Sequence, residues 1–190
     1  YRLSVKHTEL EGAALAEPIE ANVPARALRE LARVIAAEGV DEVEIAMPRN
    51  QAIFRAGGVV LSSRLIDGQF PNYQQVLPAS FATRALVDRE DLLKAVRLSA
   101  LIASSAANVV KLDVTPGEEG GLTPGSVALS ANALEVGDNR GEIDAAVEGE
   151  GTYISFSSEY LADVLGVLTS DEITVQITGP LSPAVVRGVD

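Results

Sequence analysis

Residues able to carry out covalent chemistry are scarce in this sequence. There is no cysteine, which excludes disulfides, thiol catalysis and cysteine-ligated zinc. A Ser-His-Asp triad or a histidine-rich metal centre would depend on the single histidine, His7. The HExxH, GxSxG and P-loop patterns are all missing. We therefore predict no catalytic residue, no metal site and no cofactor, and keep a hydrolase using Asp or Glu as a less favoured alternative.

The basic residues are the second candidates for chemistry, because arginine and lysine side chains bind phosphate. Arg26, Arg29 and Arg33 recur at i, i+3 and i+7. They are offset by about 200° around a helix from the apolar residues Leu28, Leu31 and Ile35. Such a face could contact phosphates or could be an ordinary solvated helix surface, and the spacing alone leaves both open.

A second, shorter basic face consists of Lys94, opposite the apolar Leu92 and Val96, and Arg97 one turn further on. These faces stand out because the net charge is −12, with 27 acidic against 15 basic residues. That balance argues against a broad basic surface for gripping nucleic acid. For nucleic-acid binding, the placement of the basic residues on helix faces matters more than the net charge.

Three amphipathic segments predict the helices that carry these residues: 24–38, about 89–104 and about 158–168. Pro24 suits the first helical position, and Gly39 is placed to end that helix. Asp88 and Ser157 are the expected N-caps of the other two helices. No apolar run approaches the roughly 18 residues that a membrane-spanning helix needs. We expect a cytoplasmic protein with no membrane partner.

β-Rich segments are expected between the helices. They cover 1–9, 42–47, 52–56, 59–66, 81–87, 108–114, 126–132, 141–148, 173–177 and 184–186. Gly137-Asp138-Asn139 is expected to be a turn. The helix starts are roughly 65–69 residues apart, which indicates a repeated α+β unit of strand, helix and further strands. The segment 67–80, interrupted by Gly68, Pro71 and Pro78, reads as a boundary.

The most specific motif lies across this boundary. Residues 63–78 read SRLIDGQFPNYQQVLP. This string resembles the junction between the second and third domains of bacterial DNA polymerase sliding clamps (the β subunit), where RLIDGxFPxYxxVLP is typical. Tyr1-Arg2-Leu3 is similar to that family's GxRL strand. The stretch 156–165 is similar to its FNxxYLxDxL helix start, and 179–183 to a later hairpin turn.

The resemblance implies a DNA-clamp fold, with helices on one face of antiparallel sheets, in a head-to-tail homodimeric ring. Residues 1–69 would be the second half of the middle domain. Residues 70–190 would be the last domain without its final strand. The function implied is that of a non-enzymatic processivity factor in DNA replication. An α+β interaction domain unrelated to replication is the alternative.

The resemblance also implies three sites and their partners. Short linear motifs of replicative and repair polymerases, the clamp loader and repair proteins would enter a pocket between the last two domains. Its residues would be Arg2, Leu3, Pro71, Gln75, Val76, Tyr160, Leu181 and Pro183. Double-stranded DNA would pass a channel lined by Arg26, Arg29, Arg33, Lys94 and Arg97. The dimer edge would include Leu101, Ile102 and the strand near 141–147.

Two features qualify these expectations. Gln75 stands where the family commonly has a basic residue, so a charge-assisted contact at this position is in doubt. Leu3, Val76 and Leu181 could equally be ordinary core residues, since apolar side chains are most often buried. Only their burial in the folded chain can decide between these interpretations.

Overall fold

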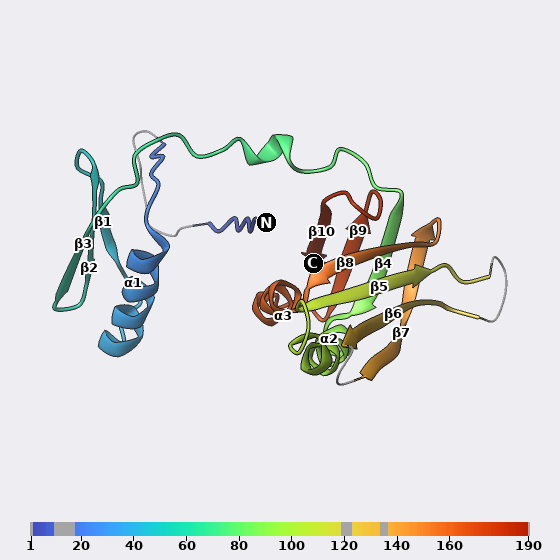
Figure 1. The fold of residues 1–190 in the computed structure, drawn as a ribbon. Coiled ribbons are helices and arrows are strands. Elements are labelled where there is room, and N and C mark those ends of the chain that lie inside the picture. Colours follow the sequence, from blue (N-terminus) through green and yellow to red (C-terminus); the bar gives the residue numbers. More distant parts are fainter. Residues whose placement is uncertain (1, 10–17, 119–122, 134–136, 190) are drawn as a thin grey trace. The chain divides into compact units, whose positions relative to one another are not determined.

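The computed structural model describes residues 2–9, 18–118, 123–133 and 137–189. The chain divides into two compact units, each of which is described by itself (Figure 1). The smaller unit comprises Ser4–Asn72. The larger unit comprises Tyr73–Asp190 together with Tyr1–Leu3.

The smaller unit is a helix with a three-stranded antiparallel sheet. Its elements are α1 (Ala25–Glu38), β1 (Glu44–Ala46), β2 (Gln51–Ala56) and β3 (Val59–Arg64), with strand order β1-β2-β3. Gly39 ends α1 in the left-handed conformation, and its N–H donates to the Ile35 carbonyl at 3.0 Å. Pro24 occupies the N-cap, one residue before the position predicted for it. The buried residue of α1 is Val34, whereas Leu28 of the expected apolar face is exposed.

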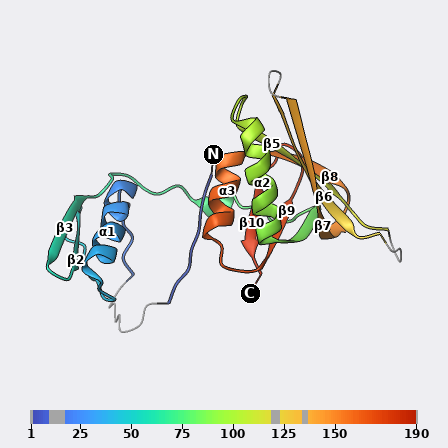
Figure 2. The same cartoon turned by 90° about the horizontal axis from the view of Figure 1, so that it is seen from below.

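The larger unit holds a seven-stranded antiparallel sheet in the order β10-β9-β4-β7-β6-β5-β8. Its elements are a 3-10 turn η1 (Tyr73–Gln75), β4 (Thr83–Asp88), α2 (Arg89–Ala103), β5 (Val109–Thr115), β6 (Gly125–Ala133), β7 (Gly137–Gly149), β8 (Thr152–Ser157), α3 (Ser158–Val167), β9 (Glu172–Ile177) and β10 (Ala184–Gly188). The helices α2 and α3 lie side by side on one face of the sheet (Figure 2). This confirms the predicted α+β class, and the predicted strand-helix-strands unit occurs twice in the larger unit, as β4-α2-β5-β6-β7 and β8-α3-β9-β10. In the smaller unit no strand among the described residues precedes α1.

A single apolar core joins the helices to this face of the sheet. Alternate residues of each strand point toward it, as the period of two in a strand requires. The core includes Leu92 and Val96 of α2, Leu161 and Leu165 of α3, and strand residues such as Leu112. Residues on the outward sides of both helices, such as Lys94 and Tyr160, are exposed.

Each helix of the larger unit follows directly from a strand and is capped as predicted. Asp88 ends β4, and its Oδ1 accepts a hydrogen bond of 2.8 Å from the N–H of Asp91. Ser157 ends β8, and its Oγ accepts one of 3.4 Å from the N–H of Tyr160. Because a cap fixes where the first turn begins, it also fixes which side chains of that helix face outward.

Arg89 ties the start of α2 to the end of α3. Its side chain is only 18% exposed. Its Nε donates to the Ser170 carbonyl at 3.1 Å, and its Nη1 to the Leu165 carbonyl at 3.4 Å. The Leu165 carbonyl belongs to the last turn of α3, where carbonyl groups have no hydrogen-bond partner within the helix. The role of Arg89 is therefore structural.

The sequence-based predictions were wrong about strands in three places. Residues 2–9 form no strand, because nothing in the described part of the chain pairs with them and a lone strand leaves its backbone groups unpaired. β8 was missed; it pairs along its length with β5. Gly137-Asp138-Asn139 is not a turn, because these residues extend β7 against Ala131–Ala133 of β6.

Gly149 lets β7 come close to the start of β4. Its φ is +90°, and a Cβ there would lie 2.0 Å from the Ala82 carbonyl oxygen. Gly141, in the same strand, has no heavy atom within 4 Å of such a Cβ. The two glycines therefore differ in what an added methyl group meets.

We predict that Gly149→Ala lowers the free energy of unfolding by at least about 2 kcal/mol, through backbone strain and the clash. Gly141→Ala should change it by less than about 1 kcal/mol, since alanine is tolerated in a strand. Urea unfolding followed by circular dichroism measures both. Equal effects of the two substitutions would contradict this account of Gly149.

Candidate functional site

Arg2, Tyr160 and Asp163 form a cluster on the outward side of α3. The Arg2 guanidinium lies over the Tyr160 ring, 4.4 Å from Cζ to the ring centroid, in cation–π geometry. Arg2 Nη1 also donates a hydrogen bond to Asp163 Oδ2. Tyr160 and Asp163 are three residues apart, so they are neighbours on one helix face. The hydrogen bond to Asp163 raises the pKa of Arg2.

The apolar residues predicted for the pocket are exposed in the structure. Leu3 is 44%, Val76 57% and Leu181 101% exposed. Core packing, the alternative interpretation for all three, is therefore wrong for this structure. Tyr160 and Pro183 are exposed as well. In the larger unit these residues offer apolar surface that the chain itself leaves uncovered.

The remaining predicted pocket residues lie on the segment before β4. Gln75 is the last residue of η1 and is exposed, and the N–H of the following Val76 donates to the Tyr73 carbonyl at 2.9 Å. Pro71, also exposed, belongs to the smaller unit. Phe70, which belongs to the same motif, is a further exposed aromatic residue of the smaller unit.

The three arginines predicted for the DNA channel lie on the solvent side of α1. Arg26, Arg29 and Arg33 are all exposed. Arg33 Nη2 donates to Glu30 Oε1 at 2.6 Å. This hydrogen bond lowers the pKa of Glu30 and raises that of Arg33. Both groups are therefore charged at neutral pH, and the face is less positive than its three arginines indicate.

The basic residues of α2 repeat this arrangement. Lys94 and Arg97 are exposed, and Lys94 Nζ lies 3.1 Å from Asp91 Oδ1. The hydrogen bond to Asp91 raises the pKa of Lys94. On each helix, one basic residue is thus paired with a carboxylate one turn before it.

The predicted dimer-edge residues differ in their surroundings. Leu101 is 70% exposed, and Leu98, one turn earlier on the same face, is also exposed. Ile102 is partly buried and packs against the core. Leu98 was not predicted, although its i, i+3 spacing from Leu101 was a usable signal.

The strand predicted for the dimer edge, β7, has a free edge. Residues 137–145 pair with β6, and residues 146–149 pair with β4. Along 137–145, one edge of β7 therefore lacks a partner strand among the described residues. Unpaired N–H and C=O groups at such an edge can accept another strand.

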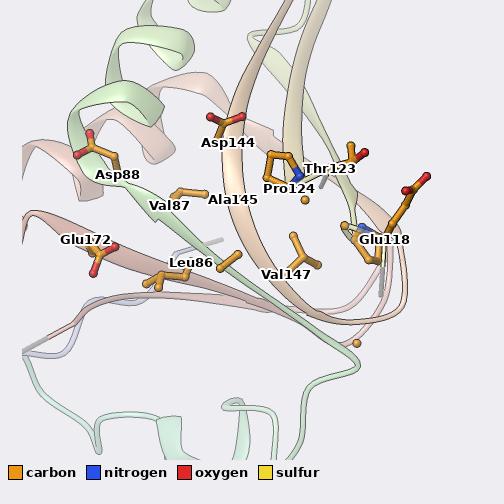
Figure 3. A pocket seen from close by; sticks show the side chains of 15 residues that line it. Leu86, Val87, Asp88, Glu118, Thr123, Pro124, Asp144, Ala145, Val147 and Glu172 are labelled. Atoms are coloured by element: carbon orange, nitrogen blue, oxygen red, sulfur yellow. The ribbon is translucent and has the colours of Figure 1, made fainter. Parts of the chain in front are cut away.

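A cavity of about 920 Å³ opens where β7 and β4 diverge (Figure 3). Leu86, Val87 and Val147 contribute apolar surface to it. Carboxylates line it as well: Asp88, Glu118, Asp144 and Glu172. None of the predicted pocket residues contributes to this cavity, so it is distinct from the cluster at Tyr160.

Two further findings concern the described residues alone. No group of three or more His, Asp or Glu side chains is arranged to hold a metal ion there. No helix among them has the length and apolar character needed to cross a membrane.

Known proteins match both parts of the chain. Residues 1–72 match the family described as DNA polymerase III beta subunit, central domain, and residues 74–190 match the C-terminal domain of the same subunit. The beta sliding clamp of Synechococcus elongatus is 36% identical over 186 residues, which are 97% of this chain and 48% of that protein. The beta sliding clamp of Bacillus subtilis is 34% identical over 167 residues, covering 87% and 42%.

Solved structures give the same answer. The crystal structure of the Bacillus subtilis sliding clamp matches with a TM-score of 0.80 and 32% identity, over 94% of this chain and 46% of that one. The sliding clamp of Bartonella birtlesii, bound to griselimycin, matches with a TM-score of 0.77 and 30% identity, over 88% and 43%.

The repeated strand-helix-strands units, with their helices on one face, are those of a sliding-clamp fold. The chain belongs to the DNA polymerase III beta subunit family. It spans about half the length of the curated relatives that it matches.

The different surroundings of Leu101 and Ile102 give a prediction. Leu101→Ala should change the free energy of unfolding by less than about 0.5 kcal/mol, because the side chain is mostly in solvent. Ile102→Ala should lower it by about 1–2 kcal/mol, because apolar atoms leave the core. Denaturant unfolding of both variants measures this, and a larger loss for Leu101→Ala would refute the assignment of faces.

Proposed function

We propose that this chain acts as part of a DNA sliding clamp, a ring that encircles duplex DNA and tethers polymerases, the clamp loader and repair proteins. Family membership over both parts of the chain supports this role. The observation that carries the proposal is that Leu3, Val76, Leu181 and Tyr160, all in the larger unit, are exposed. Uncovered apolar side chains at these positions favour capture of a partner segment.

The proposed ligand at this surface is an extended peptide that carries Leu and Phe. Its binding residues are Arg2, Leu3, Pro71, Gln75, Val76, Tyr160, Leu181 and Pro183. Apolar side chains with few polar anchors suit such a peptide, because burial of its Leu and Phe supplies most of the affinity. Gln75 adds a neutral amide, so we propose no ion pair there.

Duplex DNA is the second proposed partner, contacted by Arg26, Arg29, Arg33, Lys94 and Arg97 without reading of bases. Phosphate contacts position a protein on DNA but carry no sequence information. The net charge of −12 repels DNA from the rest of the surface, which leaves the basic helix faces as the favourable place. The paired carboxylates on both helices keep the attraction moderate.

The third part of the proposal is a homodimeric ring, closed through Leu101, Ile102 and β7. The free edge along residues 137–145 can pair with a strand of another subunit. Exposed Leu98 and Leu101 supply apolar contact near it. In this assignment, residues 1–69 belong to the middle domain and residues 70–190 to the last domain.

The test of the peptide site is a titration of a fluorescein-labelled peptide of the Gln-Leu-x-Leu-Phe type with the chain, followed by anisotropy. We expect saturable binding that disappears when the Leu and Phe of the peptide are replaced by Ala. Leu181→Ala should weaken binding about tenfold, because it removes apolar atoms from the contact.

Leu101→Ala is the matched control, since it removes the same atoms from another exposed leucine of the same unit. It should leave the dissociation constant unchanged. Saturable binding that responds to neither Leu181 nor the peptide's own side chains would refute the proposed site. No binding at all by the folded chain would count against the peptide-tethering function.

A further inference from the structure

Arg2 has a long side chain that is more than half exposed, and its position over Tyr160 needs a cause. The side chains of Arg2 and Asp163 are 57% and 64% exposed, so solvent reaches both. An exposed arginine has several rotatable bonds, and ordering it costs side-chain entropy. A cation–π contact at an exposed site is weak and does not hold such a side chain alone.

Asp163 supplies the missing constraint. Its Oδ2 accepts a hydrogen bond from Arg2 Nη1, while Cζ of the same guanidinium lies over the Tyr160 ring, 4.4 Å from its centroid. Because the guanidinium is planar, one hydrogen bond in its plane and one ring against its face fix its orientation. A lysine in place of Arg2 could satisfy the charge but not both contacts.

The capped first turn of α3 holds the other two members in place. The N–H of Tyr160 donates to Ser157 Oγ, and Asp163 follows one turn later. Arg2 is 161 residues from Asp163 in sequence, yet Tyr1–Leu3 belongs to the larger unit. The pair is thus a contact that attaches the Arg2-Leu3 segment to α3.

We propose that Asp163 is a positioning residue of the peptide site: it holds Arg2 flat on Tyr160 and so pre-forms the wall, with Leu3 beside it, on which an apolar side chain of the peptide packs. This inference rests on the proposed function and adds a residue to it. Pre-ordering of a binding surface raises affinity because the entropy of ordering is lost before the ligand arrives.

Asp163→Asn tests the inference, with the same labelled peptide and anisotropy titration. It keeps the size of the side chain and removes its charge, and we expect peptide binding about two- to fivefold weaker. Glu159→Gln is the matched control, because Glu159 also attracts Arg2 electrostatically but does not accept its hydrogen bond. It should leave the dissociation constant within about 1.5-fold of the unsubstituted chain.

Four further variants separate positioning from a general structural effect. Arg2→Gln and the double variant Arg2→Gln/Asp163→Asn should bind equally weakly, because Asp163 acts only through Arg2. Asp163→Glu should restore binding in part, and Arg2→Lys should not. Thermal unfolding should be nearly the same for all variants, because the pair is exposed.

The outcomes distinguish this inference from the function on which it rests. If the unsubstituted chain fails to bind the peptide, the proposed function is contradicted. If it binds, but Asp163→Asn behaves like Glu159→Gln, the function stands and the positioning role of Asp163 is wrong. The role is also wrong if Asp163→Asn still weakens binding when Arg2 is already glutamine.

Discussion

One-sided burial of the seven-stranded sheet is the constraint on which the rest of the larger unit depends. The strands alternate, so only one face can be lined by residues such as Leu112 and Val127, and α2 and α3 must cover that face. A helix that covers a sheet keeps its other side in solvent. Lys94 and Leu101 of α2 and Tyr160 of α3 lie on these outer sides because Leu92, Val96 and Leu161 are committed to the core. The candidate sites therefore lie on the helix faces that do not pack against the core.

The direct passage from strand to helix carries this constraint to individual side chains. No loop separates β4 from α2 or β8 from α3. The end of each strand therefore determines how the following helix is rotated about its own axis. The caps at Asp88 and Ser157 then fix the first turn. Tyr160 donates its backbone N–H to the Ser157 cap, so its position on the helix surface is set by the same residue that ends β8. Arg89, bonded to the Ser170 and Leu165 carbonyls, holds the two helices in register with each other.

What could be predicted from the sequence is what depends on near neighbours in the chain. The caps at Asp88 and Ser157 and the left-handed Gly39 follow from local hydrogen bonding and sterics, and the structure has all three. Strand pairing is long-range: residues 2–9 look like a strand but have no partner here, whereas Asp138 and Asn139 look like a turn but pair with β6. For the candidate sites, the family motif named Arg2 and Tyr160. The motif also contains Asp163, but it could not show that Asp163 pairs with Arg2, because no spacing signals a partner 161 residues away.

The paired carboxylates on the basic helix faces can be understood in the same terms. Glu30 and Asp91 each precede a basic residue by one turn, and the hydrogen bonds raise the pKa of Arg33 and Lys94. The cations therefore stay charged but share their donors with a carboxylate. A phosphate has to compete for these donors, which weakens each contact and makes it brief, whereas unpaired arginines would bind longer. For a ring proposed to move along DNA, weak and interchangeable contacts are an advantage. The carboxylates of Glu30 and Asp91 weaken the phosphate contacts of Arg33 and Lys94. They do so without removing the positive charge that a phosphate requires.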